Sequence, residues 1–188
     1  MFGIIVTIIG TLGALIIAAI GLRTWRRQLK GTAEYEVARR AVLLSYRVRD
    51  AIQAVRRPML SLRKEEVEAG RELQEEQRIY ADRIDRLLER SAELRILTLE
   101  AKVIWGVEAE QCFEPLRQLI IDIQSQVWEH FWLKGAYATP GATVDNNPER
   151  VAANNRVVYF VSEDDEFSQS INDAVRHVEI FFQRHIRG

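Results

Sequence analysis

The chain has 188 residues, a formal net charge of −1 and 47% hydrophobic residues. After its N-terminal apolar segment about 165 residues remain, which is enough for one globular domain with its own core. Cys112 is the only cysteine, which excludes an internal disulfide. The absence of an internal repeat of 20–50 residues excludes a repeat solenoid.

The first 22 residues contain no charged side chain. About 20 apolar residues in a helix match a hydrocarbon core roughly 30 Å thick. The competing interpretation is a cleaved signal peptide, which carries positive residues before a shorter apolar core. No positive residue precedes this segment, and it is too long. We therefore predict a single transmembrane helix over residues 1–22.

Basic residues follow the apolar segment at once and predict its orientation. The basic juxtamembrane segment, residues 23–31, contains the predicted membrane-interface residues Arg23, Trp25, Arg26, Arg27 and Lys30. The positive-inside rule predicts an inner-membrane protein with its N-terminus outside and its C-terminal domain cytoplasmic. We expect these cations to contact anionic lipid headgroups, and Trp25 to lie at headgroup level.

Small residues recur along one side of the predicted span, in steps of four and three. They are Gly3, Thr7, Gly10, Ala14 and Gly21, and Ile17 interrupts the series. Membrane helices pack closely where small residues let their backbones approach, so the stripe predicts self-association into a homo-oligomer. The alternative is that Gly and Ala are simply common in membrane helices, and the two interpretations stay open.

Residues 32–188 predict a cytoplasmic helical bundle. Thr32 is the expected N-cap of a helix that runs to Arg57, because Pro58 disfavours helix at the preceding residue. Residues 59–76 are expected to form the distal turn, which could be a solvated loop or a polar helical turn at the tip of a hairpin. A 4-3 repeat of coiled-coil type then predicts a second helix from about Leu73 to Phe113. Glu114 and Pro115 stop it, and a third helix is expected from Pro115 to about Leu133.

The last part of the chain is more irregular. Residues 134–156 predict a long loop, and the β-branched and aromatic residues 157–161 predict a short extended segment that only residues 142–144 could pair with. Ser162 and Asp165 resemble a capping box at the start of a final helix. The predicted fold is all-α: a transmembrane helix followed by an antiparallel bundle of about four long helices. The second helix should pack against residues 32–57.

Residues typical of catalytic and metal sites are sparse. None of His130, His177 and His185 stands three residues after a Glu, which excludes the di-iron pattern of helical bundles, and no zinc spacing occurs. Cys112 has no histidine near it in sequence, and no phosphate-binding glycine motif occurs. We therefore predict no catalytic or metal site, no cofactor and no small-molecule substrate.

Residues 23–57 hold ten Lys or Arg against three Asp or Glu, a balance of +7. We expect no nucleic-acid partner, because tethering to a membrane makes such binding awkward and two simpler explanations compete. The basic residues could contact lipid, or the distal ones could pair with the acidic second helix, and this choice stays open. That helix offers Asp82, Asp85, Glu89, Glu93 and Glu100.

Four stretches resemble a group of small uncharacterised bacterial proteins with one N-terminal transmembrane helix. They are residues 25–40, residues 46–52 with Arg57 and Pro58, residues 164–167, and Val178-Glu179 with Arg184-His185. The resemblance implies a bacterial inner-membrane setting and a helical cytoplasmic domain. It carries no activity or site residues to transfer.

Three classes of function were weighed. The leading hypothesis is a membrane-anchored, non-enzymatic helical interaction or scaffold protein that self-associates and could have a protein partner. The alternative is a membrane-perturbing effector or toxin-like protein controlled by its cytoplasmic bundle. The third class is an enzyme whose site has no recognisable motif.

Overall fold

A computed structural model describes the backbone of residues 2–138 and 147–186, and the side chains of those residues from 17 onward apart from residue 19. In these ranges the chain is all-helical and contains no strand, which confirms the predicted all-α class. The helices are α1 (Phe2–Val55), α2 (Lys64–Glu68), α3 (Glu72–Trp105), α4 (Val107–Gln111), α5 (Glu114–Leu133), α6 (Pro148–Val158) and α7 (Glu166–Ile186).

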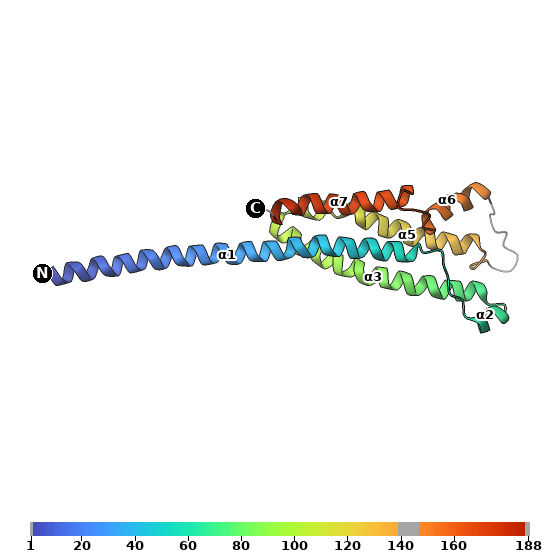
Figure 1. Cartoon of the computed structure of the whole chain (residues 1–188), viewed down its shortest axis with the longest axis horizontal. Coiled ribbons are helices and arrows are strands. Elements are labelled where there is room, and N and C mark those ends of the chain that lie inside the picture. The colour runs from blue at the N-terminus through green and yellow to red at the C-terminus, as the bar shows by residue number, and fades with distance from the viewer. Residues whose placement is uncertain (1, 139–146, 187–188) are drawn as a thin grey trace.

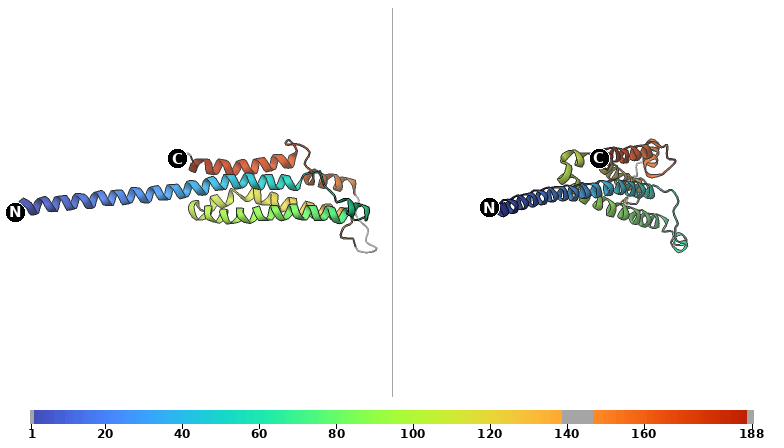
Figure 2. Two further views of the ribbon diagram at one scale, coloured as in Figure 1. Left: turned by 60° about the horizontal axis from the view of Figure 1, so that its bottom comes forward. Right: turned by 60° about the vertical axis from the view of Figure 1, so that its left-hand side comes forward.

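The N-terminal half of α1 projects alone from a packed helical body (Figure 1). The C-terminal half of α1 packs against α3 and α7, while α5 contacts α3, α6 and α7. Both further views show α1, α3 and α7 side by side, with the short α2 at the end farthest from the N-terminus (Figure 2). The chain runs outward in α1 and α5 and returns in α3 and α7. The predicted packing of the first two helices is therefore confirmed.

One contiguous core holds the body together, and among the described residues α1 joins it only from Val37 onward. Its largest fully buried apolar side chains come from α1, α3, α5, α7 and the turn before α5. They are Val48, Ile52, Val55, Tyr80, Leu87, Leu94, Phe113, Leu116, Ile123, Ile171 and Phe182. The 4-3 repeat on α3 correctly predicted Tyr80, Leu87 and Leu94 as core residues.

The expected helix start at Thr32 is wrong, because α1 continues through Gly31 without interruption. The Thr32 Oγ1 donates to the carbonyl oxygen of Gln28, one turn back at 3.0 Å, so it bonds inside the helix and caps nothing. A glycine inside a helix costs only about 1 kcal/mol relative to alanine. The helical turns on both sides of Gly31 outweigh this small cost, so the helix continues through the glycine.

The second helix ends earlier than predicted. The backbone of Gly106 has φ of +80°, a conformation that side-chain-bearing residues rarely adopt, so α3 stops at Trp105 instead of continuing to Phe113. The short α4 then leads to α5, which begins at Glu114 with Pro115 in its first turn, as predicted. The distal turn contains α2, a polar helical turn, which was one of the two alternatives for this stretch.

The extended segment predicted over residues 157–161 is wrong for Val157 and Val158, which belong to α6, whereas Tyr159 after them has extended backbone angles. The long loop predicted over residues 134–156 is likewise wrong from Pro148 onward, where α6 begins. The Asn147 Oδ1 accepts a hydrogen bond from the backbone N–H of Glu149 at 2.9 Å, and Pro148 occupies the first helical position. These start signals, together with complete burial of Val158, outweigh the β-propensity of two valines. The suggested pairing partner, residues 142–144, lies outside the described residues.

The final helix begins later than the capping box predicted, at Glu166 instead of directly after Ser162. The Asp165 Oδ1 accepts from the backbone N–H of Ser168 at 2.8 Å, so Asp165 is the N-cap of α7. The Ser162 hydroxyl accepts from the N–H of Asp164, and the Ser162 carbonyl oxygen accepts from the N–H of Asp165, so Ser162 belongs to the turn before the helix.

Over the part of the chain that the structure describes, no helix has a stretch long and apolar enough to cross a membrane. The side chains of residues 1–16 and 19, which make up most of the predicted span 1–22, lie outside the described residues. The same holds for Gly3, Thr7, Gly10 and Ala14 of the predicted self-association stripe.

Candidate functional site: a groove between α3 and α5

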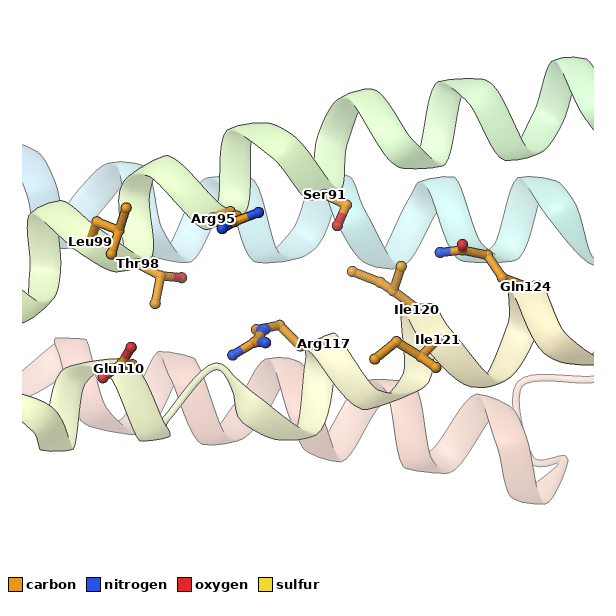
Figure 3. A pocket seen from close by; sticks show the side chains of 9 residues that line it. All are labelled: Ser91, Arg95, Thr98, Leu99, Glu110, Arg117, Ile120, Ile121 and Gln124. Carbon is orange, nitrogen blue, oxygen red and sulfur yellow. The ribbon is translucent and has the colours of Figure 1, made fainter.

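A groove of about 500 Å³ separates α3 from α5 and is closed at one end by α4 (Figure 3). Side chains from both long helices point into it. They are Ser91, Arg95, Thr98 and Leu99 from α3, Glu110 from α4, and Arg117, Ile120, Ile121 and Gln124 from α5.

The groove exists because α3 has small polar residues on the side that faces α5. Ser91 and Thr98 stand seven residues apart in the 4-3 repeat, whose neighbouring positions Leu87 and Leu94 are buried leucines. The Thr98 Oγ1 donates to the carbonyl oxygen of Leu94 at 2.8 Å, so its hydroxyl is satisfied within the helix. Two short side chains leave space that leucines would fill, and Ile120 of α5 forms the apolar floor.

Two arginines face the groove from opposite walls (Figure 3). Arg117 Nη1 donates to Glu114 Oε2 at 2.8 Å, and the groove-lining Glu110 is paired with Lys102 at 2.7 Å. Arg95 has no ion pair or hydrogen bond from its side chain to any other described residue. The guanidinium of Arg95 is therefore the one groove charge without a partner in that part of the chain.

Exposed apolar residues form the rim of the groove. Leu99 on α3 and Ile121 on α5 are 53% and 52% exposed, and Val103, one turn beyond Leu99, is 86% exposed. Exposed apolar side chains that cluster beside a groove mark an interaction site more often than single ones do. The groove thus combines apolar contact area with guanidinium donors.

Nothing in the described residues groups three His, Cys, Asp or Glu side chains as a metal site would require. Cys112 is buried, and burial raises the pKa of its thiol to about 12, so the thiol stays protonated and is a poor nucleophile. The Sγ of Cys112 donates to the carbonyl oxygen of Ala109 at 3.1 Å. The chemistry available in the groove is binding through arginine, hydroxyl and amide groups.

A second polar cluster surrounds His130, which is 3% exposed at the distal end of α5. The Asn154 Nδ2 donates to the Gln126 carbonyl oxygen at 2.8 Å, and the Asn154 Oδ1 lies 3.3 Å from His130 Nδ1. The Tyr159 hydroxyl lies 3.2 Å from His130 Nε2. This cluster fastens α6 to α5 and is a structural element.

Glu76 of α3 completes the cluster. Its Oε1 lies 3.4 Å from His130 Nε2 and accepts from Lys134 Nζ at 2.6 Å. Burial alone would raise the pKa of Glu76, but hydrogen bonds from His130 and Lys134 hold that pKa below its ordinary value. Burial and the charge of Glu76 together raise the pKa of the Tyr159 hydroxyl.

The predicted interface residues all lie on the projecting part of α1, away from the groove. All five side chains are exposed, with Trp25 the only aromatic among them. Lys30 Nζ pairs with Glu34 Oε1 one turn later, at 3.6 Å. A methyl group at Gly21, the one described member of the predicted self-association stripe, would have no atom within 4 Å.

One of the two explanations for the basic first helix was pairing with the acidic second helix, and among the described residues Arg40 and Glu100 form such a pair. Asp82 and Glu93 instead pair with arginines of α3 itself. The groove residues Arg95 and Arg117 were not singled out from the sequence. The available signal was the pair of hydroxyl residues within an otherwise apolar repeat on α3.

Comparison with known proteins adds no family to this description. No protein-family model matches the chain, and no curated protein or solved structure is significantly similar to it.

Proposed function

We propose that the chain is a membrane-anchored, non-enzymatic interaction protein. Its uncharged segment, residues 1–22, is the transmembrane anchor, and its helical body is an antiparallel bundle of four long helices on the cytoplasmic side. The observation that carries the proposal is that one unbroken helix, α1, joins the uncharged segment to the packed body. Among the described residues, α1 contributes to the core only from Val37 onward, and a helix that packs on nothing is marginal in water, so the stretch before Val37 is better stabilised by a bilayer.

The juxtamembrane residues support the anchoring. Arg23, Arg26, Arg27 and Lys30 follow the apolar segment directly and are exposed. Each cation near an anionic bilayer surface contributes about 1 kcal/mol of attraction. The bacterial proteins that the sequence resembles imply the same setting, a bacterial inner membrane.

Two reporter fusions after Gly188 test the topology. A reporter that is active only in the cytoplasm should be active, and one that is active only in the periplasm should be silent, with the protein resistant to alkaline extraction from membranes. Extraction into the supernatant, or the opposite reporter pattern, would refute the anchoring or the orientation respectively.

Self-association through the span is the second part of the proposal. Gly10→Leu and Ala14→Leu should weaken association in a membrane two-hybrid assay while leaving insertion intact, because leucine is favourable in lipid. Leu15→Ala, off the stripe, is the control. Equal signals from all three variants would show that the small residues do not form the contact.

A further inference from the structure

We propose that the groove between α3 and α5 binds an amphipathic helix of a second protein that carries acidic residues beside its apolar stripe. The proposal rests on the proposed function as an interaction protein and names the chemistry of the partner. The groove brings together an apolar floor, exposed apolar rims on two helices and an arginine on each wall.

The shape of the groove suits a helix. Helix-in-groove recognition places an apolar helix face between two walls and uses anchors three or four residues apart. Ser91 and Thr98 are short enough to let a helix backbone come close to α3, while Leu99 and Ile121 contact its sides.

The charges select an acidic partner. Arg95 has a free guanidinium among the described residues, and Arg117 is held only by Glu114 at the surface. A guanidinium presents a planar fork of donors that matches a carboxylate. Glu110, the acidic residue of the groove, is occupied by Lys102, so it does not neutralise either arginine. An acidic residue on each side of a docked helix would therefore meet one arginine.

A second copy of this chain fits the groove poorly. Two copies anchored in one membrane point the same way, so a two-fold axis between them runs along the membrane normal. Such an axis sets the Arg95 and Arg117 pair of one copy opposite the same pair of the other, and like charges at close range are unfavourable. The groove is therefore a site for a different chain, while self-association is assigned to the span.

The test uses the full-length protein in neutral detergent micelles and two synthetic helical peptides. The peptides share one apolar stripe and differ only in having Glu or Lys beside it. Fluorescence anisotropy should show the Glu peptide binding about tenfold more tightly than the Lys peptide. The double variant Arg95→Glu, Arg117→Glu should reverse this preference. An unchanged preference in that variant, or equal binding of both peptides to the wild type, would overturn the proposal.

A matched control changes the charge equally on another face. The double variant Arg47→Glu, Arg86→Glu alters residues that line a separate cavity between α1 and α3, and it should keep the wild-type preference. Equal effects of the two double variants would show that only net charge matters, and would refute the groove. Unchanged circular dichroism shows that each variant is folded.

Photo-crosslinking then locates the contact. A benzophenone amino acid at Leu99 should capture the Glu peptide, whereas the same group at Ile180 on α7, which is 54% exposed, should not. Capture of a second copy of the chain from Leu99 would assign the groove to self-association and overturn the proposal. Because these assays are carried out in micelles, their outcome is independent of the reporter and extraction tests of membrane anchoring.

Discussion

Arg56 Nη2 donates to Asp165 Oδ1 at 3.0 Å and so joins the end of α1 to the N-cap of α7. Arg56 is completely buried, and its guanidinium also donates to the Ser168 hydroxyl at 2.7 Å. The Nε donates to the carbonyl oxygen of Val157, and Nη2 also reaches the carbonyl oxygens of Arg156 and Tyr159. One side chain thus satisfies acceptors at the end of α6 and the start of α7.

Arg56→Ala should destabilise the body by about 3–5 kcal/mol, because it leaves the Asp165 carboxylate without its ion-pair partner and several carbonyl oxygens without their donor. Urea denaturation followed by circular dichroism measures the loss. Arg57→Ala, at an exposed neighbouring position, should change stability by less than about 0.5 kcal/mol. Comparable losses from both variants would mean that the network does not hold the helices together.

Two tyrosines near His130 should respond in opposite ways to removal of the hydroxyl. The Tyr80 hydroxyl is buried and has no hydrogen-bond partner among the described residues, so Tyr80→Phe should raise stability by about 1 kcal/mol or more. The Tyr159 hydroxyl bonds His130 Nε2, so Tyr159→Phe should lower stability by about 1 kcal/mol. Thermal melts of both variants measure these changes. A lower melting temperature in Tyr80→Phe would contradict the prediction that its hydroxyl is unsatisfied.

The stability of the body should fall in acid, because Glu75 loses its ion pairs when it is protonated. Hydrogen bonds from Arg78 and Arg63 hold the pKa of this carboxyl well below its ordinary value of 4.5. Since its folded pKa is depressed, the stabilisation is fully present above pH 4.5 and is lost as the pH falls below that value. Glu75→Gln should lower the urea midpoint at neutral pH but reduce its further fall at about pH 3.5. Glu72→Gln, an exposed change on the same helix, should leave the fall as large as in the wild type.

The packing of α1 predicts one further outcome. Val48 is fully buried in the core, so Val48→Asp places an unpaired carboxylate there and should abolish cooperative unfolding of the body. Val103→Asp makes the same chemical change at a residue that is 86% exposed and should leave the melting temperature nearly unchanged. A cooperative melt near the wild-type temperature in Val48→Asp would show that this face of α1 is not core.

Periodicity predicted much of the helical body because its helices bury one face each. The repeat through Leu87 and Leu94 fixed the core side of α3, and Pro115 fixed the start of α5. The end of α3 was missed, because a glycine alone does not show whether a helix stops: α1 continues through Gly31, whereas Gly106 takes a positive φ and ends α3.

Other features depended on contacts that a sequence pattern does not contain. Burial of Val158 against the core decides that α6 is a helix, and this contact involves residues far away in the chain. Arg56 is equivalent to its exposed neighbour Arg57 in the sequence, and only the folded chain distinguishes them. The groove was missed for the same reason, because Arg95 and Arg117 become neighbours only when α3 and α5 are placed side by side.

Because α1 is one unbroken helix, it sets both the distance and the rotation of the packed body relative to the N-terminal segment. About 15 residues separate Leu22 from Val37, the first core residue of α1 among those described, so the helix holds the body about 22 Å from the end of the apolar segment. Each residue also turns the helix by about 100°. The number of residues in that interval therefore sets the direction, about the axis of α1, in which the α3–α5 groove faces relative to the N-terminal segment. Inserting a single alanine after Thr32 would swing the groove through more than a quarter turn and raise it by only about 1.5 Å. In a complex of anchored proteins, the number of residues in this interval therefore sets the side from which a partner approaches.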